Sequence, residues 1–172
     1  MFGDNSAIIE DELSDVTEDC LQFVTFKLQD EEFAIEVLKV QEIIRPLDIT
    51  RVPKCAGFIE GVISLRGKVI PIINMRKRFD LPLSENTNDS RVIVVDVDGK
   101  AAGLIVDSVS EICRLGPDSI EPRPASLDNN IGKEYIKGIG KQDDRLIVLL
   151  EIDKVLNSEE KEALGSLDTE LF

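Results

Sequence analysis

The chain has 172 residues, 42% of them hydrophobic, which suffices for one compact domain or two small packed ones with a buried core. It contains no His, which excludes Ser-His and Cys-His nucleophiles, His zinc ligands and a phospho-accepting His. Twenty basic against 34 acidic residues give a net charge of −14, which argues against a nucleic-acid partner or an anionic membrane surface.

The negative charge lies mainly at the two ends of the chain. Residues 1–20 hold seven acids and no base, and residues 157–172 hold five acids and one base. The stretch 21–156 therefore carries a net charge of only −3. Acidic ends of this kind usually keep a protein soluble. We expect residues 1–19 to form an acidic mobile tail.

The cysteines and the apolar runs bear on location. The three cysteines, Cys20, Cys55 and Cys113, stand far apart and form no CxxC pair. An odd number of cysteines, without the pattern of a secretory signal, predicts a reducing cytoplasm. The longest apolar run, Leu146 to Leu150, is far too short to span a bilayer. We therefore expect a cytoplasmic protein with no direct membrane insertion.

Short β-type segments follow one another along the chain, separated by turn residues. They are 21–28, 33–35, 43–44, 62–63, 69–73, 91–97, 104–106 and 146–152. A short helical turn is expected at 36–39. Within 158–172 we expect a helix and tail, because Asn157 can cap the segment, Glu160 holds the capping-box position and Gly165 supplies a stop. The pattern predicts an all-β fold of small barrels or a sandwich, with a short C-terminal helix.

An internal repeat divides the body into two related β modules, about 21–83 and 91–156. An offset of 77 residues aligns 58–61 with 135–138 and 68–75 with 145–152, and an offset of 69 aligns 24–28 with 93–97 and 37–43 with 106–112. Each module is too small to be comfortably stable alone, so the two should share a core, with a groove where they meet. Whether strands cross between the modules stays open at this point.

No catalytic or ligand-binding motif stands out. The sequence lacks GxGxxG, GxxxxGK[ST] and GxSxG. Turns and close backbone approach explain its glycines better than phosphate binding, and its acid clusters lack the spacing of a calcium loop. Cys55 and Cys113 have no neighbour in the sequence that could act as a general base for the thiol, and they are better explained as small buried hydrophobic residues. We therefore expect no enzyme activity, no cofactor and no metal.

Two basic features need an explanation. Arg76-Lys77-Arg78 is best explained as a solvated or salt-bridged strand end; an acidic protein partner fits less well, and nucleic acid least, because Phe79 is the only aromatic neighbour. Arg66 stands between an apolar stretch and a Gly turn, where its guanidinium needs a carboxylate or a partner. A structural ion pair and a partner contact fit Arg66 equally well.

Five blocks of sequence carry a resemblance to a known family. They are FAIEVLKVQEI at 33–43, ITRVP at 49–53, FIEGVISLRGKVIPIINMR at 58–76, GLIVDSV at 103–109 and YIKGIG at 135–140. In order and spacing these blocks resemble the CheW family of chemotaxis coupling proteins, and the resemblance covers about residues 20–160, a CheW-like domain. Ser64 and Asn74 depart from the family pattern, which usually has Asn and Asp there.

The resemblance implies both a fold and a role. Members of this family are two SH3-like five-stranded β-barrel subdomains sharing a core, and they have no catalytic activity. They bridge the cytoplasmic tip of methyl-accepting chemotaxis receptors to the regulatory domain of a CheA-type histidine kinase, beneath the inner membrane. The chain is therefore expected to be such an adaptor. The alternative is a free-standing CheW-like regulator that tethers a kinase in a non-flagellar pathway.

The resemblance also implies the residues of the sites. The expected residues of the receptor groove are Val40, Glu42, Gly61, Arg66, Val106 and Val109. Glu42 and Arg66 are expected to form an ion pair that links two neighbouring strands. The expected kinase contacts are Pro46, Ile49 and Arg51, together with the ends of the second barrel.

Overall fold

The computed structural model describes residues 20–46, 49–51, 59–79, 81–122 and 135–155. The expected acidic tail and the expected C-terminal helix lie outside these residues. The described part consists of eleven strands and a few short helical turns, so the all-β prediction is confirmed. No helix in this part of the chain is long and apolar enough to cross a membrane.

Most of the strands contain one of the apolar runs of the sequence. The strands are β1 (Leu21–Leu28), β2 (Glu31–Glu36), β3 (Val40–Ile44), β4 (Ile59–Leu65), β5 (Lys68–Asn74), β6 (Arg91–Val97), β7 (Lys100–Val106), β8 (Ser108–Leu115), β9 (Ile120–Pro122), β10 (Ile136–Gln142) and β11 (Arg145–Leu150). The helical turns are η1 (Val37–Lys39), α2 (Met75–Arg78), η2 (Pro117–Ser119) and η5 (Ile152–Lys154). The short helix α2 was not predicted from the sequence. It begins after Asn74, whose side chain accepts a hydrogen bond from the Lys77 backbone N–H at 3.2 Å.

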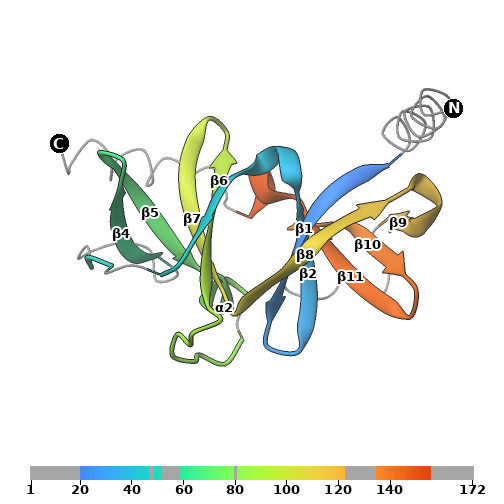
Figure 1. Ribbon diagram of the computed structural model, residues 1–172, viewed down its shortest axis with the longest axis horizontal. Coiled ribbons are helices and arrows are strands. Elements are labelled where there is room, and N and C mark those ends of the chain that lie inside the picture. Colours follow the sequence, from blue (N-terminus) through green and yellow to red (C-terminus); the bar gives the residue numbers. More distant parts are fainter. Residues whose placement is uncertain (1–19, 47–48, 52–58, 80, 123–134, 156–172) are drawn as a thin grey trace, which may run out of the picture.

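Two curved sheets make up the described fold. One has six strands in the order β8-β1-β2-β11-β10-β9, and the other has five in the order β3-β6-β7-β5-β4. The sheets are two SH3-like subdomains whose strand orders do not close. Figure 1 shows them side by side, with the hairpins β4–β5 and β10–β11 at opposite ends of the long axis. The sixth strand is β9; its counterpart in the other sheet is a single bridge between Thr50 and Val62.

Strands cross between the two repeats. Each sheet combines the first hairpin of one repeat with the later strands of the other. The registers recur accordingly: Val40 pairs with Val95, and its repeat counterpart Val109 pairs with Phe26. The parallel pairing of β2 with β11 likewise recurs as that of β7 with β5. Apart from β9, the strands of one sheet therefore have structural counterparts in the other.

Three clusters of apolar side chains form the core, and one of them is shared by the two sheets. The first takes its buried residues from the six-stranded sheet alone: Phe23, Ala34, Cys113, Leu115, Ile147 and Leu149. The second takes them from the five-stranded sheet alone: Ile63, Ile70, Ile72, Val92 and Val94. The largest draws on both sheets and includes Phe26, Ile35, Ile93 and Leu104. Because this shared core would be exposed if the subdomains separated, it binds them into one unit.

Candidate functional site

Two crossovers carry the chain from one sheet to the other. The turn η1 joins β2 to β3, and Asp107 joins β7 to β8. Three of the predicted groove residues lie at these crossovers. Val106 is buried in the shared core, and Val40 and Val109 pack against that core while remaining partly exposed. The structure thus brings these three valines together on one cluster.

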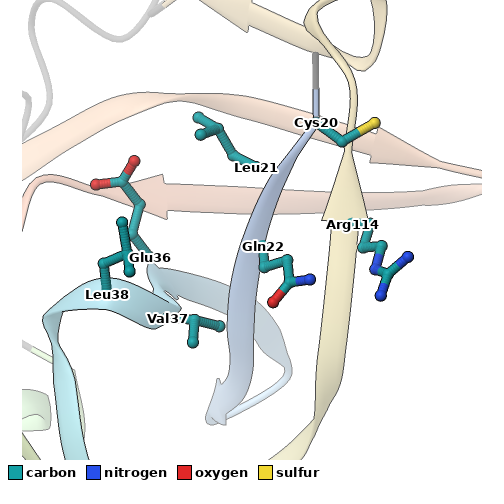
Figure 2. A pocket seen from close by; sticks show the side chains of 7 residues that line it. All are labelled: Cys20, Leu21, Gln22, Glu36, Val37, Leu38 and Arg114. Carbon is teal, nitrogen blue, oxygen red and sulfur yellow. The ribbon is translucent and has the colours of Figure 1, made fainter. Parts of the chain in front are cut away.

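A pocket of about 290 Å³ lies beside η1. Figure 2 shows the seven residues that line it, which are Cys20, Leu21, Gln22, Glu36, Val37, Leu38 and Arg114. They come from the start of β1, the end of β2, η1 and β8. Leu38 is 94% exposed and Leu21 is 42% exposed, so large apolar side chains face solvent here. Exposed apolar surface of this kind marks a contact site when it is concentrated in one place.

Sequence reasoning missed this pocket. None of the six predicted groove residues lines it, although Val37 and Leu38 stand just before Val40, and Arg114 shares β8 with Val109. The available signal was the apolar pair Val37-Leu38 in a helical turn only three residues long, which cannot bury both side chains.

Glu42 and Arg66 come together at the five-stranded sheet. Arg66 Nη2 donates to Glu42 Oε1 at 3.1 Å. Arg66 occupies the β4–β5 turn with a φ of 53°, and Gly67 follows with a φ of 79°, as a two-residue hairpin turn requires. The expectation of neighbouring strands is wrong, because β3 and β4 are the two outer strands of this sheet. The pair therefore joins opposite edges of a curved sheet.

The exposure of Arg66 decides what the pair contributes. The Arg66 side chain is 78% exposed, whereas that of Glu42 is 27% exposed. An ion pair so open to solvent contributes less than about 1 kcal/mol to stability. The guanidinium of Arg66 therefore remains accessible to a partner while it contacts Glu42.

Gly61 contributes through its lack of a side chain. Its φ is 154°, a conformation that other residues rarely adopt, and a Cβ there would lie 2.2 Å from the carbonyl oxygen of Thr50. Thr50 exchanges two backbone hydrogen bonds with Val62, at 2.9 and 2.8 Å. Glycine at position 61 therefore lets the segment 49–51 lie directly against β4.

The three predicted kinase contacts differ in exposure. Pro46 is partly buried, and Ile49 packs against the core of the five-stranded sheet. Arg51 is exposed. Of the three, Arg51 thus offers the most surface to a partner, and Ile49 mainly packs against the core of the five-stranded sheet.

The six-stranded sheet carries a denser ion cluster, which sequence reasoning also missed. Arg145 donates to Glu32 Oε2 at 2.6 Å and to Glu111 Oε1 at 2.7 Å. These bonds, that to Glu32 above all, raise the pKa of the Arg145 guanidinium above its ordinary value. Glu111 is the repeat counterpart of Glu42, and that alignment was the one signal available in the sequence.

The basic cluster 76–78 is engaged inside the molecule. Its contacts are Arg76 Nε to Asp107 Oδ1 at 2.9 Å, Lys77 Nζ to Glu60 Oε1 at 2.7 Å, and Arg78 Nη2 to the Tyr135 hydroxyl at 2.5 Å. The interpretation as a salt-bridged strand end is confirmed. Among the described residues, no group of three Cys, Asp or Glu side chains is arranged to hold a metal ion.

Known proteins resemble this chain over most of its length. Residues 22–160 match the family profile of the CheW-like domain. The chain is 38% identical over 142 residues to the chemotaxis protein CheW of Helicobacter pylori, covering 83% of this chain and 85% of that protein. It is 36% identical over 139 residues to CheW of Klebsiella aerogenes, covering 81% and 83%. The crystal structure of the scaffolding protein TtCheW from Thermoanaerobacter tengcongensis matches with a TM-score of 0.75 and 36% identity, covering 83% of this chain and 96% of that one.

Proposed function

We propose, because the chain belongs to the CheW family, that it is a non-catalytic adaptor coupling methyl-accepting chemotaxis receptors to a CheA-type histidine kinase. It would act in the cytoplasm, at receptor arrays beneath the inner membrane. The observation that carries the proposal is the apolar pocket beside η1, where Leu38 is 94% exposed next to the partly exposed Val40. Such a surface suits the side of a helix from a partner protein.

The pocket and the two crossovers together offer a receptor helix several apolar anchors. Leu21 and Leu38 flank the pocket, while Val40 on β3 and Val109 on β8 provide the walls of the proposed groove. Ile112, which is 63% exposed, adds a further apolar residue on β8. A helix held in a groove is anchored by apolar side chains at helical spacing, so this set matches the tip of a helical hairpin.

The remaining groove residues act at the rim. Gly61 fixes the segment 49–51 on β4, and Glu42 orients the exposed Arg66. A guanidinium in this position can recognise a carboxylate of the receptor without being desolvated in the free protein. Arg66 is therefore expected to influence partner choice more than the stability of the fold.

The kinase is expected to bind at the ends of the molecule. The hairpins β4–β5 and β10–β11 lie at opposite ends of the long axis, so one kinase domain can bind at each end (Figure 1). Because Arg66 lies in the β4–β5 turn, the receptor rim adjoins the first of these ends, whereas the β10–β11 end lies away from it. Pro46 and Arg51 would serve the first end with Ile49 supporting them, and the hairpin of Arg145 would serve the second. An adaptor with a groove along its middle and two free ends can link receptors and kinases into an extended array.

The test measures binding of the purified chain to a receptor cytoplasmic fragment and, separately, to the kinase regulatory domain. We expect both to bind, and all three to sediment as one complex. Leu38→Asp should weaken receptor binding by about 2 kcal/mol, because it places a charge in an apolar contact. Leu83→Asp is the matched control, since Leu83 is also a large exposed apolar residue but does not line the pocket.

The outcomes separate the possible roles. Absence of binding to either partner would contradict the proposal. Binding to the kinase domain without binding to any receptor fragment would favour a kinase tether outside chemoreceptor arrays. Equal losses in the Leu38 and Leu83 variants would show that the pocket is not the receptor site.

A further inference from the structure

Each crossover is tied by an ion pair to the helical turn that follows the last strand of one of the two repeats. Lys39 of η1 lies with its Nζ 3.0 Å from Asp153 Oδ2 in η5, which follows β11. Asp107 accepts from Arg76 in α2, which follows β5. Arg76 and Asp153 are repeat counterparts at the offset of 77 residues. The two pairs thus have the same architecture but opposite charge.

The Asp107 crossover is held by several bonds. Arg76 donates to both carboxylate oxygens, and its side chain is only 16% exposed. The Gln29 backbone N–H donates to Asp107 Oδ2 at 2.7 Å, and the Asp107 N–H donates to the Lys27 carbonyl at 3.0 Å. These bonds fix the crossover to the β1–β2 hairpin as well as to α2. The wall that continues into Val109 is therefore rigidly placed.

The η1 crossover is held more weakly. Lys39 makes one hydrogen bond to Asp153, and both side chains are about a third exposed, at 33% and 29%. The other oxygen of that carboxylate, Asp153 Oδ1, is buried without a hydrogen-bond partner. A lysine stem is also more flexible than the planar fork of an arginine. A second tie runs from Glu36 Oε1 to Lys137 Nζ at 2.9 Å.

The weaker attachment of η1 matters because η1 forms part of the pocket wall. Its residues Val37 and Leu38 line the pocket, and Val40 follows at once. At its C-terminal end the turn is closed by a backbone hydrogen bond from the Val40 N–H to the Val37 carbonyl. The position of the pocket wall therefore depends on the side chains that hold η1 from outside.

We propose that Asp153 is a positioning residue for receptor binding: through Lys39 it holds η1 so that the pocket keeps the shape that receives a receptor helix. The η1 wall adjusts to the partner, while the Asp107 wall stays fixed. This inference rests on the proposed function. It assigns a role to a residue that lies outside the groove and does not touch the receptor.

The test uses Asp153→Asn in the full-length chain, a change that removes the charge and keeps the shape. Two quantities are measured: hydrogen exchange of the Val40 amide without any partner, and the Kd for a receptor cytoplasmic fragment. Val40 exchange should become faster, and the Kd should rise about threefold, the scale of a partly exposed ion pair. Affinity for the kinase regulatory domain should stay unchanged.

Two further variants distinguish positioning from a general loss of structure. The charge reversal Lys39→Asp with Asp153→Lys rebuilds the pair with opposite sign, so both quantities should return to within about twofold of the wild type. Glu121→Gln breaks the pair between Lys141 and Glu121, whose atoms lie 2.5 Å apart outside the pocket lining, and should change neither quantity.

Each outcome bears on the inference. Unchanged Val40 exchange in Asp153→Asn, or faster exchange with an unchanged Kd, would overturn it. Charge reversal that restores neither quantity would also overturn it. A wild-type chain that does not bind the fragment would overturn the proposed function and the positioning role with it, while the Val40 exchange would still report whether Asp153 holds η1.

Discussion

The hairpins β4–β5 and β10–β11 are repeat counterparts that place an arginine in different surroundings. In the first, Arg66 lies in the turn, 78% exposed, and pairs with the Glu42 carboxylate. In the second, the turn position belongs to Asp143, and Arg145 at the start of β11 is 37% exposed and contacts two carboxylates. An arginine in the turn is therefore accessible to a partner, whereas an arginine in the strand forms ion pairs within the protein. The β4–β5 hairpin is thus suited to binding a partner, and the β10–β11 hairpin to stabilising the fold.

The largest effect on stability is expected from replacing Gly61 and Gly138, which occupy corresponding positions in the two hairpins. Gly61→Ala should cost about 3 kcal/mol, because the new Cβ would lie 2.2 Å from the Thr50 oxygen and the φ of 154° is strained for alanine. Gly138→Ala should cost about 1 kcal/mol less. Its Cβ would also crowd a carbonyl, at 2.6 Å from Glu121, but its φ is not in the strained region. Urea unfolding measures both values; equal costs would show that backbone conformation does not distinguish the hairpins.

Smaller losses of stability are expected when the two arginines are replaced. Arg145→Ala should reduce the free energy of unfolding by about 2 kcal/mol, because the mostly buried carboxylate of Glu32 loses the cation that pairs with it. Arg66→Ala should reduce it by less than about 1 kcal/mol. Thermal or urea unfolding of the two variants under the same conditions gives the comparison. A larger loss for Arg66 would reverse the assignment of the stabilising end.

The two crossover pairs predict opposite responses to pH. Burial opposes ionisation of Asp107, but hydrogen bonds from Arg76 and the Gln29 N–H outweigh it and lower the pKa of the carboxyl below its ordinary value. A lowered pKa gives stability that is complete above the unfolded pKa of about 4 and is lost as pH falls through the folded pKa. The hydrogen bond to Asp153 raises the pKa of Lys39. Its contribution is complete below about pH 10 and is lost as pH rises through the folded pKa.

Removing one partner of each pair should therefore reduce the pH dependence of the free energy of unfolding, at acid pH for one pair and at alkaline pH for the other. Asp107→Asn is expected to weaken the dependence on pH below about 4, and Lys39→Gln that above about 10. The free energy of unfolding measured across pH checks both. An acid limb that is the same in Asp107→Asn as in the wild type would contradict the role given to this carboxylate.

The smallest effect is expected from the acidic end of the chain. Deleting residues 1–17 should change the free energy of unfolding by less than about 1 kcal/mol, because the core of the described part begins at Phe23. The deletion also removes acids from a chain whose ends carry most of its net charge. A large drop in Tm would show instead that this segment is docked on the body.

The sequence predicted those strands that carry their own apolar pattern. β6 reads Arg-Val-Ile-Val-Val-Asp-Val and was predicted with its full bounds. β8 and β10 were not predicted: β8 mixes Glu111 and Arg114 with its apolar residues, and β10 contains Gly138 and Gly140, which weaken a strand on their own. Both are strands because β1 and β11 pair with them. Tertiary context supplied what local propensity lacked.

The site was predictable only in part. The resemblance supplied Glu42 and Arg66, and the structure brings them together. The pocket needs Leu38 of η1 and Arg114 of β8 to lie near each other, which depends on how strands cross between the repeats. Both possible arrangements of the repeats bury the same residues, so apolar pattern alone cannot choose between them. The Arg145 cluster was missed for the same reason, because its three members come from three strands.

The most direct test of the adaptor account is separate titration of Val40→Asp against a receptor cytoplasmic fragment and against the kinase regulatory domain. Gln41→Asp, an exposed neighbour on β3, is the matched control. The account predicts that Val40→Asp weakens receptor binding by about 2 kcal/mol or more, while kinase binding survives and the control changes neither. Unchanged receptor affinity would place the groove elsewhere. Equal loss of both affinities in a variant that is still folded would mean that the two sites overlap. That result would contradict the account, which assigns one surface to receptors and the two ends to kinases.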